Sequence, residues 1–578
     1  MRQLTIALPA LALSVTLSNG ASGTLERAPL LAMERELVRA PGGSDTTGER
    51  RTLDDWARGA QIFPSMGDFH REITSRSPEA RAYFDQGMRF LWVFNHDEAS
   101  RSFARAAQLD PECASCYWGL ALTLGPNYNM QMMAPARSAA AWEALSKARQ
   151  YAPRTTPVEQ ALIRALAQRY EGPQTPSAER AATALTGYAG EMRKVARQFP
   201  SDLDVQTLFA EALMNTMPWK LWNADGSPAP VTNEIVATLE AVLHKDPMHP
   251  GANHYYIHAV ESSLRPERAM PSAERVGAMM PAAGHLVHMP AHIMQRVGRY
   301  EDAAEANRRA AAADDRYYTK TRAIDYYPVV YSAHNYQFLA SAAAMEGRSR
   351  ETIRAMRSAR AVLSDRLLLR MPGADWSLAY LYEGMIRFGR WEMILHEPAP
   401  NAHMTGLVVG YLEARAAALA ARGRLADAKS TVASLDEAIA STPEDGVAGM
   451  NAAPPVYKIA SLRAKARIAK AERKRSLAIA LLRQAVSEED QLAYDEPADE
   501  FFPTRHLLGA ALLDGGFAHE AETVYREDLR RYPANGWSLY GLSRALEAQG
   551  HTREAAVERR LFAHAWRHAD VAIRSSAF

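Results

Sequence analysis

Cysteine is almost absent from this chain of 578 residues, which has only Cys113 and Cys116, in the segment DPECASCYWG. A single CxxC pair cannot supply the four thiolates of a structural zinc site. No βαβ pattern surrounds the pair, so a thioredoxin-like role is weakly supported. The spacing favours a local disulfide that ties a turn between helices, and a redox or metal-binding role stays open.

A charge excess of either sign is also absent. The chain has 67 Lys and Arg residues against 66 Asp and Glu residues, which leaves a net charge of +1. Proteins that bind nucleic acid or anionic membrane surfaces through a global field carry a much larger excess. We therefore expect neither of these partners.

Long apolar runs are missing beyond the N-terminus, where no stretch approaches the roughly 18 uncharged apolar residues of a membrane-spanning helix. The N-terminal sequence MRQLTIALPALALSVTLSNGASG has an early positive charge at Arg2, a short apolar run and then small residues. This order predicts a signal peptide over residues 1–23, although a disordered start of a cytosolic protein is the alternative. We expect an exported, periplasmic protein without a membrane anchor after cleavage.

Alternating β-branched runs are nearly absent as well. From about residue 65, alanine-rich amphipathic segments alternate with Gly, Pro or Asp-Pro, a pattern that predicts helices throughout. Residues 24–64 are polar and rich in Gly and Arg, so we expect a poorly ordered N-terminal segment. Residues 218–235 and 492–506 lack helical periodicity and are predicted to be inserted loops.

Internal repeats then define the architecture. The segments GRYEDAAEANRRA, GFAHEAETVYREDLRRYP and GHTREAAVERRLFA share one pattern, and Ala521 and Ala555 lie 34 residues apart, as do Ala269 and Ala303. In this period the chain resembles the tetratricopeptide repeat family. The resemblance implies an all-α fold over residues 65–578, a right-handed superhelical α-solenoid of antiparallel helix pairs.

Histidine is concentrated in one region, where His254, His258, His285, His288 and His292 place five of the 17 histidines within 39 residues. In HYYIHAVE, His254, His258 and Glu261 stand at i, i+4 and i+7. In HLVHMPAH, the three histidines stand at i, i+3 and i+7. Each set falls on one face of a helix.

The repeat register gives these faces a direction. We call the set His254, His258 and Glu261 the first stripe and the set His285, His288 and His292 the second stripe. Counted from Gly298 and Ala303, both stripes occupy first-helix positions that the family resemblance places in the concave groove. The next unit, counted from Gly347, adds His334 and Gln337. The chain also resembles, over nearly its whole length, exported bacterial tetratricopeptide-repeat proteins that carry similar HYYIHAVE and GHLVHMPAHI segments. This resemblance implies a fold but does not point to a particular function.

Several imidazoles beside a carboxylate suit a transition metal such as zinc, copper, iron or manganese. Neighbouring helices lie roughly 10 Å apart, so their side chains can share one ion. We therefore predict a metal site in the groove from the residues His254, His258, Glu261, His285, His288, His292 and His334. If the site is catalytic, the ion acts as a Lewis acid or redox centre, and Glu261 or a groove tyrosine transfers protons.

Other interpretations stay open. A histidine pair at i, i+4 often packs without a ligand, and Pro290 breaks or kinks the helix that carries the second stripe. If that helix begins at Pro290, His285 and His288 leave the shared face. Groove histidines also suit a peptide or partner protein, which makes the chain a non-catalytic scaffold. The HExxH signature, nucleophile triads and phosphate-binding loops are absent.

Two loops carry side chains of less certain role. The carboxylates of Asp325, Asp495, Glu496, Asp499 and Glu500 could add metal ligands, although we expect the acidic loop from Asp495 to Glu500 to be solvated. Trp219 and Trp222, in the segment PWKLW, either form the wall of a pocket or hold their own loop in place, and the second role is favoured.

Overall fold

A computed structural model describes residues 52–131, 133–321, 327–369, 371 and 373–578. All described residues belong to one unit of the chain. The signal peptide predicted over residues 1–23 and the candidate ligand Asp325 lie outside the described residues.

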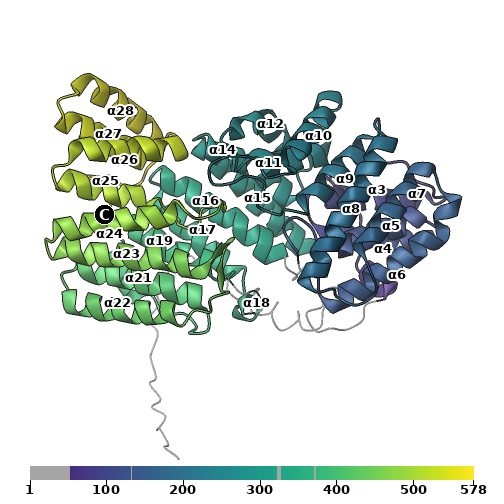
Figure 1. Ribbon diagram of the computed structural model, residues 1–578, viewed down its shortest axis with the longest axis horizontal. Coiled ribbons are helices and arrows are strands. Elements are labelled where there is room, and N and C mark those ends of the chain that lie inside the picture. Colours follow the sequence, from purple (N-terminus) through teal and green to yellow (C-terminus); the bar gives the residue numbers. More distant parts are fainter. Residues whose placement is uncertain (1–51, 132, 322–326, 370, 372) are drawn as a thin grey trace, which may run out of the picture. The chain divides into compact units, whose positions relative to one another are not determined.

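Almost all of the regular secondary structure in the described chain is helical (Figure 1). The α-helices of its first half are α2 (Leu53–Ala57), α3 (Pro78–Trp92), α4 (His96–Leu109), α5 (Ala114–Leu124), α6 (Pro135–Tyr151), α7 (Pro157–Leu166), α8 (Ala178–Gln198), α9 (Leu203–Met214), α10 (Thr232–Lys245), α11 (Pro250–Val260), α12 (Met270–Met279), α13 (Gly284–His288) and α14 (Pro290–Arg296).

The α-helices of the second half are α15 (Tyr300–Thr321), α16 (Ala333–Met345), α17 (Ser349–Ala361), α18 (Asp365–Leu368), α19 (Tyr380–Arg387), α20 (Trp391–His396), α21 (Thr405–Ala421), α22 (Leu425–Ala440), α23 (Ala453–Ala471), α24 (Arg475–Glu489), α25 (Thr504–Asp514), α26 (Ala518–Arg531), α27 (Gly536–Ala548) and α28 (Thr552–Ala565).

Short elements complete the chain. The 3-10 helices are η1 (Ala152–Arg154), η2 (Ala167–Arg169), η3 (Pro266–Ala269) and η5 (Trp376–Leu378), and η4 (Pro328–Ser332) is a π-helix. The strands β1 (Val447–Ala448) and β2 (Asn451–Ala452) pair antiparallel, with Val447 opposite Ala452.

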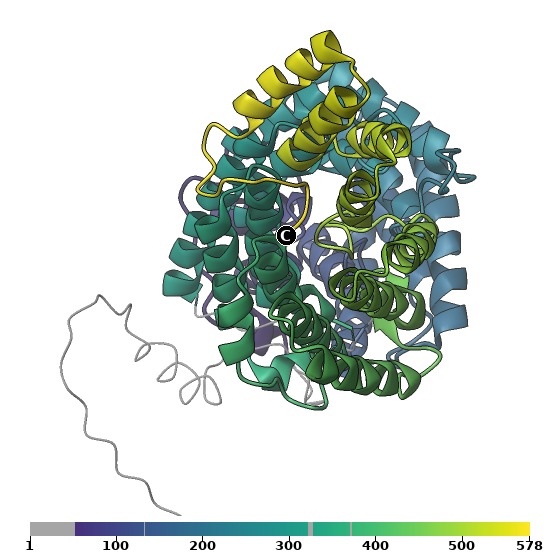
Figure 2. The same cartoon turned by 90° about the vertical axis from the view of Figure 1, so that its left-hand side faces the viewer.

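Consecutive helices pack as antiparallel pairs, among them α14 with α15, α16 with α17, α25 with α26 and α27 with α28 (Figures 1 and 2). The turns inside these pairs use a glycine with positive φ, which only glycine adopts without strain: Gly298, Gly347, Gly516 and Gly550. The repeat alanines Ala269, Ala303, Ala521 and Ala555 are all fully buried. The prediction of an all-α solenoid of helix pairs is confirmed.

The C-terminal residues fold back onto α17, where the backbone N–H of Ser349 donates to Asp570 Oδ1 at 2.7 Å; Figure 2 marks the end of the chain. The hydroxyl of Ser576 donates to the carbonyl of His506 at 2.8 Å, and the indole of Trp537 donates to the carbonyl of Ala344 at 2.8 Å. Helices that are almost 200 residues apart in the sequence therefore contact each other.

The described end of the 24–64 segment differs from the poorly ordered chain that its composition predicts. Thr52 caps α2 in a reciprocal capping box with Asp55, and Trp56 and Phe63 are buried. Helix α2 packs on α4, so tertiary contact orders a stretch that is too polar to form its own core. The two inserted loops are also slightly shorter than predicted, because α10 begins at Thr232 and α25 at Thr504.

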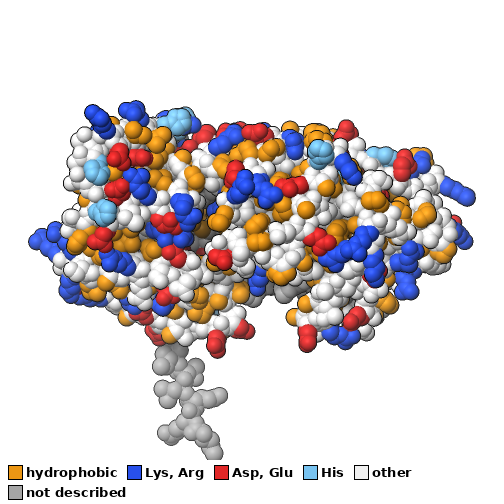
Figure 3. Space-filling model, turned by 45° about the horizontal axis from the view of Figure 1, so that its top comes forward, with side chains coloured by type: hydrophobic (Ala, Val, Ile, Leu, Met, Phe, Trp, Pro, Cys, Tyr) orange, Lys and Arg blue, Asp and Glu red, His pale blue; other side chains and the backbone are white. Residues whose placement is uncertain are grey.

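Cys113 and Cys116 form a disulfide at the start of α5, and both residues are buried. The Cys113 sulfur accepts a hydrogen bond from the Cys116 backbone N–H, which caps the helix. None of the described helices is long and apolar enough to cross a membrane. On the face drawn in Figure 3, basic and acidic side chains are intermixed, as the balanced composition predicts.

Candidate metal centre

The sequence-predicted ligands come together in the first helices of three successive pairs. His254 and His258 lie on α11, with Glu261 as its C-cap, and the three histidines of the second stripe lie on α13 and α14. These five histidines and Glu261 are 0–2% exposed. His334, on α16, is partly exposed.

Pro290 does not separate the second stripe from its helix. Met289, between α13 and α14, keeps helical angles of φ −51° and ψ −34°, and its N–H donates to the carbonyl of His285 at 3.2 Å. A proline at the first position of a helix loses only its own donor. The ring centroids of His288 and His292 are 4.5 Å apart, so the stripe stays on one face.

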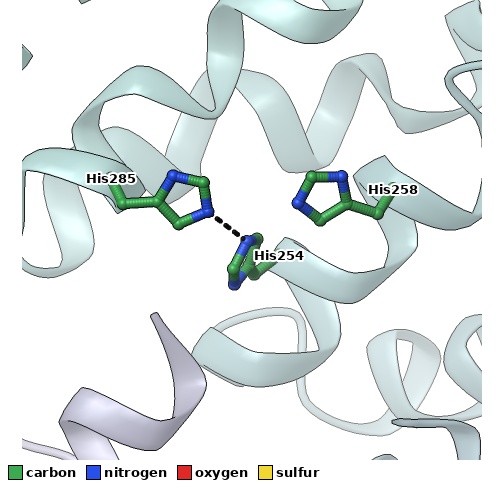
Figure 4. A group of neighbouring side chains, drawn as sticks. All are labelled: His254, His258 and His285. Atoms are coloured by element: carbon green, nitrogen blue, oxygen red, sulfur yellow. Dashed lines mark hydrogen bonds between the residues drawn. The ribbon is translucent and has the colours of Figure 1, made fainter. Parts of the chain in front are cut away.

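One group, here named the first triad, consists of His254, His258 and His285, whose ligand atoms lie within 4.8 Å of one another. Figure 4 shows the three rings converging from α11 and α13. The Nδ1 of His254 donates to the carbonyl of Trp92 at 2.6 Å, and the Nδ1 of His258 donates to Glu261 Oε1 at 2.8 Å. These bonds leave the Nε2 lone pair of both rings free to bind an ion.

The Nε2 atoms of the first triad face one another. His285 Nε2 donates a hydrogen bond of 3.2 Å to His254 Nε2, a proton that a bound ion would displace, and His258 Nε2 has no hydrogen-bond partner in the part of the chain that the structure describes. Two imidazoles on a tetrahedral zinc ion, with Zn–N near 2.0–2.1 Å, have nitrogens roughly 3.3 Å apart. The observed spacing therefore fits ligands that share one ion.

The second triad consists of His288, His292 and His334, again within 4.8 Å. The Nδ1 of His288 donates to Asn307 Oδ1 at 2.7 Å, and its Nε2 lies 2.6 Å from His292 Nε2. The ring of Phe338 lies 4.7 Å from each of the three imidazoles and forms an apolar wall. Asn307 and Phe338 were not singled out by the sequence pattern.

Two carboxylates flank His292. Its Nδ1 lies 2.6 Å from Glu261 Oε2 and 2.7 Å from Glu496 Oε1, distances of ion pairs. The expectation that the acidic loop is solvated is wrong for Glu496, Asp499 and Glu500, which are buried. The loop is held at several points, and the hydroxyl of Tyr494 donates to Glu496 Oε2 at 2.9 Å.

Burial sets the charge state of the histidines. It lowers the pKa of His258 and of His334 to about 3, and it lowers the pKa of His254, His285 and His288 well below the ordinary value. Burial acts in the same direction on His292, but the carboxylates of Glu496 and Glu261 outweigh it and raise its pKa to about 10. At neutral pH five rings are therefore neutral, the form that binds metal.

Aromatic side chains close the first triad. Phe94 lies 4.6 Å from the His254 ring, and Trp219 lies 5.6 Å from the His258 ring. Both residues have positive φ, 56° and 61°, which costs of order 1–3 kcal/mol for a residue other than glycine. Tyr331, in the π-helix η4, lies 4.4 Å from the His285 ring. Such backbone outliers gather at functional sites.

The sequence left two roles open for Trp219 and Trp222, the wall of a pocket and the anchor of their own loop, and each residue has one of them. Trp219 forms part of the wall beside His258, whereas the indole of Trp222 donates to the carbonyl of Ala259 at 2.8 Å and fixes the loop on α11. The non-helical segment before α10 thus delivers one side chain to the site and uses another as an anchor.

The predicted open groove is corrected by the burial of the cluster. The segment between α3 and α4 covers it through Phe94, and the loops before α10 and before α25 cover it through Trp219 and Glu496. The repeat register alone predicts that the concave surface of the array is open to solvent. In this protein the inserted segments cover that surface, so among the clustered histidines only His334 stays partly exposed.

No family model and no curated protein matches the chain. Among solved structures, it is similar to the human IFIT1 dimer with m7Gppp-AAAA at 13% identity and a TM-score of 0.33, over 79% of this chain and 90% of that chain. Yeast Tom70 gives 12% identity and a TM-score of 0.29, over 84% and 90%. The TPR domain of P58(IPK) gives 13% and 0.22, over 82% and 99%. Sequence identities and TM-scores this low do not allow a ligand or an activity to be assigned to this chain.

Proposed function

We propose that this protein binds a transition-metal ion in the first triad, through the Nε2 atoms of His254, His258 and His285. The observation that carries the proposal is the fixed direction of these lone pairs. Acceptors at Trp92 and Glu261 hold the Nδ1 protons of two rings on the side away from the third. Such outer-shell partners orient metal-ligating histidines in known sites.

The ligand set defines the class of ion and its chemistry. Three neutral imidazoles suit zinc, copper or iron and leave a fourth position for water or a substrate oxygen. If the ion catalyses a reaction, it acts as a Lewis acid or redox centre. Both oxygens of Glu261 contact histidines, which supports an orienting role for Glu261 and leaves proton transfer to a nearby tyrosine such as Tyr128, 5.7 Å from His258.

Location and partners are part of the same proposal. The N-terminal sequence supports export to the periplasm, an oxidising compartment in which the disulfide between Cys113 and Cys116 persists. The alternative function, a non-catalytic scaffold for peptides or partner proteins, follows from the repeat architecture. Burial of the cluster means that such a partner would bind elsewhere than on these histidines.

Metal analysis of the full chain, purified without a histidine tag, tests the proposal. We expect at least one equivalent of zinc, copper or iron, or uptake of at least one equivalent of added Co²⁺ with the visible bands of a tetrahedral site. His258→Ala removes a ligand and should weaken Co²⁺ binding at least tenfold. His244→Ala, an exposed histidine on α10, is the matched control.

Circular dichroism and the melting temperature establish that both variants are folded. Less than a tenth of an equivalent of any transition metal, with no uptake on titration, overturns the proposal. Equal affinity of His258→Ala and the control also contradicts it, because the ion must then lie elsewhere.

A further inference from the structure

The second triad repeats the features on which the proposed metal site of the first triad rests. The amide nitrogen of Asn307 donates to the carbonyl of Ala303 at 2.7 Å, so its oxygen must be the group that faces His288. His288 therefore donates from Nδ1 and keeps its Nε2 lone pair. That lone pair faces His292 Nε2 at 2.6 Å, with the His334 ring centroid 4.9 Å from that of His288.

Glu261 connects the two triads. Its Oε1 accepts from His258 Nδ1 at 2.8 Å, and its Oε2 lies 2.6 Å from His292 Nδ1. The rings of His258 and His292 have centroids only 5.2 Å apart. One carboxylate thus contacts a histidine of each triad and fixes the two triads relative to each other.

Charge supports a second cation beside the first. Glu261 and Glu496 both approach His292, and neither carboxylate has an Arg or Lys partner among the ion pairs of the described chain. An ion bound beside these two buried carboxylates would supply positive charge that no Lys or Arg of the described chain provides.

The second triad also lies nearer to solvent. His334 is the partly exposed member of the cluster, whereas the first triad is closed by Phe94, Trp219 and Tyr331. An ion or an oxygen ligand that enters from the His334 side reaches the second triad first. Three imidazoles leave at least one coordination position there for such a ligand.

We propose that His288, His292 and His334 bind a second transition-metal ion, so that the loaded protein contains a two-metal centre joined through Glu261. This inference rests on the proposed function of the first triad. The ligand class for the open positions is a small oxygen donor, such as water, hydroxide or a carboxylate, because two divalent ions exceed the charge of the two glutamates.

Titration of the metal-free full chain with Co²⁺ tests the stoichiometry, and titration with Cu²⁺ followed by electron paramagnetic resonance tests the proximity of the ions. We expect two equivalents to bind. The Cu²⁺ signal should grow up to the first equivalent and then broaden or diminish with the second, because neighbouring unpaired spins interact.

His334→Ala is the main variant, since a partly exposed side chain tolerates truncation best. It should retain one equivalent of Co²⁺ and keep an unbroadened Cu²⁺ signal. His334→Gln, which keeps more of the volume, should behave in the same way. Tyr336→Phe, on the same helix and also partly exposed, is the matched control and should bind two equivalents.

The outcomes separate the two proposals. One equivalent in the unaltered chain and in His334→Ala overturns the second ion and leaves the first triad standing. Two equivalents that persist in both His334 variants, or two equivalents without spin interaction, also overturn it, because the second ion then lies outside this triad. No binding at all overturns both proposals.

Discussion

The chemistry of the candidate site depends on which nitrogen of each imidazole holds the proton. For His254, His258 and His288, the Nδ1 proton has a defined acceptor: the Trp92 carbonyl, Glu261 and Asn307, respectively. Without these acceptors the two tautomers of a neutral histidine would be similar in energy. Residues outside the ligand set thus decide whether the rings present lone pairs or protons to one another.

In the metal-free protein, the buried neutral histidines of the cluster should lose their contribution to stability as the pH falls below about 6.5. His258 and His334, with pKa values of about 3, bind fewer protons when folded than when unfolded, so their contribution is present above 6.5 and is lost toward pH 3. At pH 5, each histidine that stays neutral in the folded chain lowers the free energy of unfolding by about 2 kcal/mol relative to neutral pH. His292, with a pKa of about 10, has the opposite sign, and its stabilisation is lost as pH rises through 10.

Urea unfolding of the metal-free chain at pH 7.5 and pH 5.0 measures this effect. Within the cluster five histidines oppose one, so His334→Phe, which lacks one of the five, should lose less stability between pH 7.5 and pH 5.0 than the unaltered chain. The same loss in both chains, with ring proton shifts that show charged imidazoles in the folded state, would contradict the assigned charge states.

At the scale of elements, the loop between α24 and α25 joins the site to the second half of the solenoid. Glu496 reaches His292, and four residues later Glu500 pairs with Arg463 on α23. The same guanidinium contacts Glu413 on α21 at 2.8 Å and Glu383 on α19 at 3.2 Å. One buried cation therefore holds three helices and the loop that carries a site carboxylate.

Arg463→Gln should destabilise the protein by about 3–5 kcal/mol, because it leaves three buried carboxylates without a positive partner. Lys465→Gln, two residues further along α23, removes an exposed pair with Asp436 and should cost less than about 1 kcal/mol. Urea midpoints of the two variants give the comparison. Similar losses for both would show that Arg463 is not the link described here.

At the scale of the whole molecule, the site is assembled from residues more than 200 positions apart, from His254 to Glu496. An ion that needs all the rings of a triad in place binds the native chain more tightly than the unfolded chain. It stabilises the folded state by RT ln(1 + [L]/Kd), or about 4 kcal/mol at a thousandfold excess over Kd.

Addition of Zn²⁺ should therefore raise the melting temperature of the full chain, and a chelator should reverse the rise. Differential scanning calorimetry is the measurement, with His258→Ala as the variant in which the rise should shrink or vanish and His244→Ala as the one in which it should persist. A melting temperature that does not respond to Zn²⁺, Cu²⁺ or Co²⁺ in the unaltered chain would count against a site formed only on folding.

The sequence by itself determined the helical array and the composition of the two histidine stripes. Spacings of three, four and seven residues place His254 with His258, and His285 with His288 and His292, on common faces, because helical periodicity is fixed by local backbone geometry. The glycine and alanine pattern defined the repeat register for the same local reason. This register identified His334, 42 positions after His292, as a further candidate ligand.

Only the tertiary structure decided that the stripes form a closed cluster rather than line an open groove. The Trp92 carbonyl, Phe94, Trp219 and Glu496 arrive from segments whose local sequence contains no metal-ligand spacing. Their positions depend on which helices and loops pack together, a non-local property. The helix direction at Pro290 was also settled there, because a proline can either begin a helix or continue one after a single missing hydrogen bond.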